Sequence, residues 1–313
     1  MAHDLGLRDS LEVGSVATIR NVFYGLELAG LVGAVVMLLT AIIWRKIVRR
    51  HASWFNFMVT WIISCSSYIF LLGESVGRTP NHSLCLSQAA LIFSVPTLTS
   101  AATSALVIHV YLTMRQVLTM STHCQASWTT ALLIGPYIPT LAMLIFCLRL
   151  ALHNPSLVFR PDDGTYCTFN TKLPGRVSGI VVVVIMLFCL AIEIIIFRHL
   201  RRAWKILKKE NCSSISTIVR VLAFTLVGML SIILSLLIMV IPNSLNSAFN
   251  IVIAIVPVSS VLIFGTQKDI FTAWASGFRC RETHGTDTWD TFTPHASLRT
   301  ITRQVSGTHE SHV

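Results

Sequence analysis

The segment that decides the fold class is residues 177–197, with the sequence VSGIVVVVIMLFCLAIEIIIF. These 21 residues include a single charged one, Glu193. A helix needs about 20 mainly apolar residues to cross the ~30 Å hydrocarbon core of a bilayer. Residues 177–197 therefore have the length and the composition of a membrane helix.

Six further runs of the same kind occur along the chain, which gives seven predicted membrane helices. They lie at 21–44, 54–73, 85–114, 128–148, 177–197, 216–240 and 247–264. The whole chain of 313 residues is 53% hydrophobic and only 12% charged, about half the charge of an ordinary soluble domain. Its mean hydropathy of +0.69 also indicates a chain that is largely embedded in lipid. We therefore expect an all-α membrane protein, a seven-transmembrane helix bundle.

The segments outside the spans divide the rest of the chain. We expect an extracellular N-terminus at 1–20, the transmembrane domain at 21–264, and a short interfacial eighth helix at 265–280. The polar, Thr/Ser-rich residues 281–313 have no apolar period and predict a disordered cytoplasmic tail.

Basic residues predict the orientation of the helices. Segments 45–53, 115–127 and 198–215 carry eleven Lys and Arg, whereas 74–84, 149–176 and 241–246 carry five. Loops rich in Lys and Arg stay in the cytosol. We therefore expect a multi-pass plasma-membrane protein with its N-terminus outside and its C-terminus in the cytosol.

On this topology, two of the eight cysteines face the oxidising side of the membrane. Cys85 opens the third predicted helix and Cys167 lies in the second outer loop, so they are expected to form a disulfide. Two free thiols are the alternative. The sequence Asn81-His82-Ser83 is a glycosylation motif on the same side, although it lies close to the membrane.

Seven helices, an outer N-terminus and these two cysteine positions together resemble a G-protein-coupled receptor. The stretch from Ser53 through Ala90 and the ending Ile263–Asp269 are similar to receptor-like proteins of mushroom-forming fungi. Tyr111-Leu-Thr-Met-Arg115 lacks the Asp/Glu-Arg-Tyr motif of rhodopsin-like receptors, and Pro257-Val-Ser-Ser-Val lacks their Asn-Pro…Tyr motif. The resemblance implies a cell-surface receptor that passes an extracellular signal to a cytosolic heterotrimeric G protein by helix rearrangement.

Polar residues within the spans suggest where a ligand binds. Prolines at 96, 136, 139 and 257 kink helices and open gaps between them. An intramembrane charge is costly and is usually functional, although Glu27 could equally bond hydroxyls of a neighbouring helix. The candidate pocket residues are Glu27, Tyr68, Ser94, Thr97, Tyr137 and Asn250.

Small residues predict how the helices pack. Gly25, Ala29 and Gly33 recur at four-residue spacing, a pattern that permits close helix contact. Residues 94–105 are rich in Ser, Thr and Ala, which suits the most central helix of a bundle.

Three charges near the cytosolic ends of the spans predict a switch. Glu193 is expected to pair with Arg220 or with Arg115, because their depths match and their signs are opposite. Breaking the pair would free the sixth helix. The alternative is that both arginines reach lipid phosphates and that Glu193 is solvated.

A basic cytosolic surface is the expected G-protein contact. Residues 199–209 continue the fifth helix as a cationic amphipathic segment, and attraction to anionic lipid is the simpler role. Cys280 follows the interfacial helix and is a candidate for palmitoylation. The expected contact residues are Arg45, Lys46, Arg49, Arg50, Arg201, Arg202 and Lys205.

Other function classes find less support in the sequence. There is no nucleophile motif, paired catalytic carboxylates or metal cluster, so we expect neither an enzyme nor a cofactor. The expected partners are an unknown extracellular ligand, a heterotrimeric G protein and membrane lipids, with no nucleic acid. A small-solute transporter and a non-signalling membrane scaffold remain the alternatives; no internal repeat favours the transporter.

Overall fold

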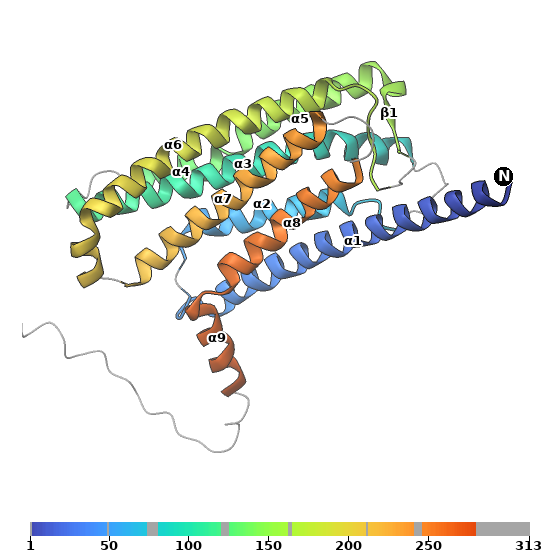
Figure 1. Cartoon of the computed structure of the whole chain (residues 1–313). Helices are drawn as coiled ribbons and strands as arrows, with labels where there is room; N and C mark the ends of the chain where they lie inside the picture. The colour runs from blue at the N-terminus through green and yellow to red at the C-terminus, as the bar shows by residue number, and fades with distance from the viewer. Residues whose placement is uncertain are drawn as a thin grey trace, which may run out of the picture. The chain divides into compact units, whose positions relative to one another are not determined.

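A computed structural model describes residues 2–48, 50–73, 81–119, 125–161, 165–210, 212–240 and 246–279. Within these ranges the chain is almost entirely helical, so the all-α prediction is confirmed (Figure 1). The helices are α1 (Ala2–Ile43), α2 (Ala52–Tyr68), α3 (His82–Thr119), α4 (Gln125–Ile134), α5 (Tyr137–His153), α6 (Leu173–Glu210), α7 (Cys212–Val240), α8 (Asn246–Gly265) and α9 (Lys268–Arg279).

Among the described residues, four stretches of helix are long and apolar enough to cross a membrane. They are Ala17–Ile43, His82–Gln116, Trp128–His153 and Leu173–Arg201. The pair α8 and α9, bent by 72°, supplies a fifth when taken as one span. The α2 helix has 17 residues, and the apolar stretch within the described side chains of α7 is Ile218–Leu234. Both of these stretches are shorter than a standard span.

The outward faces of the long helices are apolar, which supports embedding in lipid. On α6 the side chains of Ile180, Val184 and Leu187 are more than half exposed, and they fall on one face at spacings of four and three residues. Leu226 and Leu230 repeat this pattern on α7. Soluble proteins rarely expose contiguous apolar faces of this kind.

The α3 helix is the central one, as its small residues predicted. It packs against α2, α5 and α6, and most of its apolar window is buried, whereas only a third or less of the windows of α1 and α6 is buried. Hydroxyls along α3 bond their own helix; the Thr103 hydroxyl, for example, donates to the Thr99 carbonyl at 2.7 Å.

The α1 and α8 helices are held at a close approach by two glycines. A Cβ on Gly33 would lie 2.5 Å from Val261, and one on Gly30 would lie 2.8 Å from Pro257. Of the predicted Gly25, Ala29 and Gly33 face, only Gly33 is in tight contact, because Gly25 and Ala29 point outward. The predicted contact face of α1 was therefore wrong by about one residue, because the close contacts are made by Gly30 and Gly33 and not by Gly25 and Ala29.

Two local features depart from a simple series of unbroken helices. The fourth predicted span divides at Gly135 and Pro136 into α4 and α5, where the proline ring removes a backbone donor. In the segment between α5 and α6, β1 (Val158–Phe159) pairs antiparallel with β2 (Thr168–Phe169) after the short 3₁₀ helix η1 (Pro155–Leu157). The cationic continuation of α6 is helical to Glu210, as predicted.

Candidate functional site

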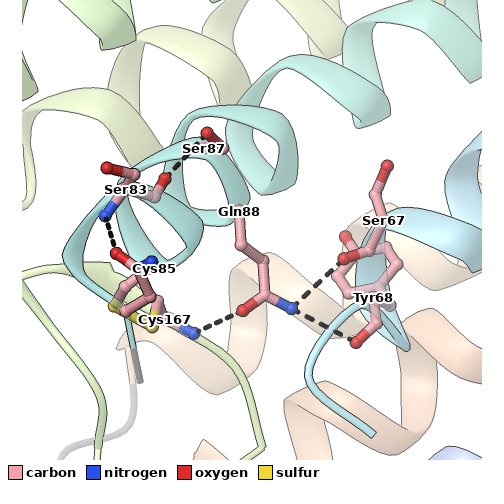
Figure 2. Close-up of a disulfide and its surroundings, with 8 residues drawn as sticks. Ser67, Tyr68, Ser83, Cys85, Ser87, Gln88 and Cys167 are labelled. Atoms are coloured by element: carbon pink, nitrogen blue, oxygen red, sulfur yellow. Dashed lines mark hydrogen bonds between the residues drawn. A yellow bond between two sulfur atoms is a disulfide. The ribbon is translucent and has the colours of Figure 1, made fainter. Parts of the chain in front are cut away.

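A disulfide fixes the hairpin segment to the start of α3. Cys85 and Cys167 are bonded, with their Cα atoms 5.3 Å apart, which confirms the predicted pair (Figure 2). Both cysteines are buried. We call the end of the helices that carries this bond the disulfide end.

Gln88, one turn after Cys85 on the same helix, extends this connection to α2. Its side-chain amide donates to the carbonyls of Ser67 (3.2 Å) and Tyr68 (3.5 Å), and its carbonyl oxygen accepts from the Cys167 backbone N–H at 3.0 Å (Figure 2). The last carbonyls of a helix have no partner within the helix, and Gln88 supplies one. The sequence analysis missed this residue. Its signal is an amide three residues after Cys85 in an apolar run.

The segment before β2 reaches further, to α1 and α8. The Tyr24 hydroxyl donates to the Thr165 carbonyl, and the Tyr166 hydroxyl donates to the Asn250 side chain at 2.6 Å. The Phe23 ring lies about 6 Å from both the Tyr68 and the Tyr166 ring. These contacts join α1, α2, α8 and the segment before β2.

The helices line a cavity with a volume of about 600 Å³, which is within the range of small-molecule sites. Its wall is built from α1, α2, α3, α6, α7, α8 and the hairpin segment, and it is mainly apolar. Representative wall residues are Trp61, Tyr68, Phe93, Tyr166, Val183 and Phe224.

Glu27 is the one acidic residue in the described wall of this cavity. Its side chain is 1% exposed, and neither carboxyl oxygen has a hydrogen-bond partner by distance and angle. The Cys65 thiol lies beside it and is at most a weak donor. Burial without a partner is expensive for such a group.

The six candidate pocket residues separate into two groups. Glu27, Tyr68 and Asn250 come from three different helices and lie together in the cavity wall. Ser94 and Thr97 are buried but do not line it. The Ser94 hydroxyl instead bonds carbonyls of its own helix. Tyr137 lies outside the wall as well, and its hydroxyl donates to Asn56 on α2 at 2.7 Å.

The expected pairing of Glu193 with an arginine does not occur in this structure. The Thr225 side chain of α7 lies beside the Glu193 carboxyl group, but its hydroxyl donates to the Val221 carbonyl of its own helix. Arg220 donates to the carbonyls of Ile263 and Thr266, the latter at 2.8 Å. These carbonyls lie at the C-terminal end of α8, where the helix dipole favours a cation. The Arg220 side chain therefore extends toward the end of α8 and not toward Glu193. Arg115 is exposed at the far end of α3.

A different ion pair joins this end of the helices. Arg50, before α2, pairs with Asp269 in α9 and lies 5.8 Å from the centre of the Trp54 ring. Burial lowers the pKa of Arg50, and the Asp269 carboxylate opposes that shift. The Trp274 indole N–H also donates to Thr40 of α1 at 3.0 Å. We call this end, which carries Arg45, Lys46 and Arg50, the basic end.

The remaining predicted residues are placed as follows. Three of the basic residues are exposed, namely Arg45, Lys46 and Arg201. The Cζ atom of the Arg201 guanidinium lies 4.3 Å from the centre of the Phe197 ring. Asn81 is exposed just before α3. Outside the described residues or side chains are Arg49, Arg202, Lys205 and Cys280.

Comparison of the chain with protein-family models and with curated proteins finds no match. The geometry alone therefore guides the functional assignment. It offers a mainly apolar cavity with one acidic group in its described wall, and exposed arginine and lysine side chains at the basic end.

Proposed function

We propose that the protein is a seven-transmembrane receptor of the G-protein-coupled type that binds a small molecule in the cavity and signals to a heterotrimeric G protein. The observation that carries this proposal is the cavity itself. Six helices and the disulfide-anchored hairpin segment contribute to one wall. A molecule bound there contacts all of them at once and can shift their relative positions.

The seven-span arrangement is part of the same proposal. As a helix, α7 has 29 residues, which at 1.5 Å per residue is about 43 Å and exceeds the bilayer core. The shorter α2 packs between α1 and α3, two helices that qualify as spans. Counting α2 and α7 together with the five spans gives seven and leaves the two termini on opposite sides.

The basic end supports coupling to a cytosolic protein. Arg45, Lys46 and Arg201 are exposed there, and the positive-inside rule assigns this end to the cytosol. The Arg50–Asp269 pair connects the turn after α1 to α9. A change in the position of α8 would therefore also move the residues of the basic end, where we propose that a G protein docks.

The proposal can be tested in cells by resonance-energy transfer between Gα and Gβγ, using a panel of Gα subtypes and a small-molecule library. We expect at least one subtype to respond, and Arg45→Ala with Lys46→Ala to weaken the response at equal surface expression. The matched control is Arg149→Ala with Arg160→Ala, on the opposite side in the predicted topology. Absence of a response from every subtype would contradict receptor function, and vesicle uptake of a bound compound would favour the transporter alternative.

A further inference from the structure

We infer that the cavity takes a ligand with an apolar body and one cationic amine, and that the ammonium group of this ligand pairs with the Glu27 carboxylate. This inference rests on the proposed function, because it names the class of molecule that the receptor would bind. Its first support is Glu27 itself, which is 1% exposed, lines the cavity and has both oxygens unpartnered by geometry.

The described wall of the cavity does not provide a counter-charge for Glu27. The described wall of the cavity contains no lysine, arginine or histidine. The ion pair found in the described part of the chain, Arg50–Asp269, is at the opposite end of α1. A buried carboxylate is stabilised only when it is paired and hydrogen-bonded. A cation that enters with the ligand meets this requirement.

The rest of the wall suits the same ligand class. Aromatic rings of Trp61, Tyr68 and Phe224 line the cavity, and the faces of such rings attract ammonium groups. Ser64, one helical turn before Tyr68, is also in the wall and can accept a second hydrogen bond from an ammonium N–H.

The position of Glu27 also orients the ligand. The α1 helix packs against α2 and α8, whereas α6 packs against α3 and α7. Glu27 and the apolar α6 residues Val182, Val183 and Met186 therefore belong to different sides of the cavity wall. We expect the amine to point toward α1 and the apolar body toward α6. A volume of about 600 Å³ admits a drug-sized molecule of this shape.

The test uses the full chain in phosphatidylcholine nanodiscs and two fluorescent probes, dansylcadaverine and its N-acetyl derivative. The two share an apolar aromatic body, and only the first has a cationic amine. Because the amine can make a charge-assisted hydrogen bond, its dissociation constant should be about 10- to 100-fold lower than that of the acetylated probe. We call this ratio the amine preference. We expect this preference in the wild-type chain.

Glu27→Gln keeps the size of the side chain and removes its charge. We expect it to reduce the preference to about threefold or less, with binding of the acetylated probe retained as a sign that the cavity is intact. Glu193→Gln is the matched control, since Glu193 is a buried acid with an unpartnered oxygen that does not line the cavity. It should keep the preference. If Glu27→Gln does not fold, Glu27→Asp preserves the charge and should keep the preference at lower affinity.

The results separate this inference from the proposed function. No saturable binding of the amine, equal binding of both probes by the wild-type chain, or an unchanged preference in Glu27→Gln would overturn the inference. So would a loss of preference in Glu193→Gln as large as in Glu27→Gln. Amine selectivity without any G-protein response would leave the inference standing and contradict the receptor. A response to uncharged compounds alone would do the reverse.

Discussion

At the scale of single residues, Gln88 shows how one amide can join three elements. Its side chain is fully buried, and it bonds the end of α2 through two carbonyls and the hairpin segment through the Cys167 N–H. All of these backbone groups need a partner where water is excluded. Gln88 thus works beside the disulfide in holding the hairpin segment over the cavity.

Replacing this amide tests that role. Gln88→Leu keeps a similar volume and leaves the bonded backbone groups without their partner, at a cost of about 1–3 kcal/mol for each buried group. Thermal unfolding in detergent should show a clear loss of stability. The neighbouring Ser87→Ala is the control, since Ser87 is exposed and bonds only its own helix. Equal melting temperatures for the two variants would contradict the role assigned to Gln88.

His51 predicts a pH dependence at the basic end. Its Nδ1 accepts from the Ser53 N–H as the cap of α2, and its ring stacks on His109 at 3.7 Å. Burial lowers the pKa of His51 from its ordinary 6.5, so below pH 6.5 the unfolded chain binds more protons than the folded one. Stability should therefore be constant above about pH 7.5 and fall as the pH is lowered through 6.5.

Melting temperatures at pH 7.5 and pH 5.5 would measure this dependence. His51→Asn retains a good helix cap and has no ionisable group, so the decrease in melting temperature between the two pH values should be smaller than in the wild-type chain. The exposed His153→Asn should leave it unchanged. A decrease in His51→Asn as large as in the wild-type chain would exclude this histidine as the source.

At the scale of elements, the sequence predicted which segments are helical but not how they turn or face. Each of the seven apolar runs contains helix, because apolar length is a strong signal. The second run, 54–73, extends five residues past the end of α2 at Tyr68. The break at Pro136 had a visible cause in the proline. The hairpin of β1 and β2 had none, since each strand has two residues and is held by the disulfide and by long-range contacts. Rotation of a helix about its axis is set by tertiary packing, which explains the shift from Ala29 to Gly30 in the α1 contact face.

Gly33 provides the corresponding prediction. An added methyl would meet Val261 at 2.5 Å, so Gly33→Ala must push α1 and α8 apart or repack Val261. Overpacking of this kind costs about 1–3 kcal/mol. Gly25→Ala is the matched control on the same helix, because nothing lies within 4 Å of the added Cβ, and alanine favours the helix. Thermal unfolding should distinguish the two, and a similar effect of both variants would contradict close packing at Gly33.

At the scale of the whole molecule, half of the candidate pocket residues lie together in the cavity wall. Glu27, Tyr68 and Asn250 were chosen for polarity and depth, and the structure brings them into one wall. Ser94 and Thr97 met the same criteria but do not reach the cavity, because the sequence does not specify which way a helix faces. The Arg50–Asp269 pair was also hidden, since it joins residues 219 positions apart.

Membrane orientation is the property of the whole chain that the sequence predicts most directly. The eleven-to-five excess of Lys and Arg on one set of loops predicts that the basic end lies in the cytosol. Epitope tags at both ends should therefore show the N-terminal tag in intact cells and the C-terminal tag only after permeabilisation. A C-terminal tag accessible from outside would contradict the seven-span topology.

Charge substitutions make this test sharper. The cluster that follows the first span should fix its direction, because the residues nearest the ends of a span contribute most. Changing four basic residues there to Gln should produce a mixed population in which part of the N-terminal tag is hidden. The same number of changes in the predicted outer segment 149–176 should leave the orientation as it is or strengthen it. The first set is Arg45, Lys46, Arg49 and Arg50, and the control set is Arg149, Arg160, Lys172 and Arg176. If both sets affect the tags equally, the charge asymmetry does not determine the topology, and the assignment of the basic end to the cytosol loses its support.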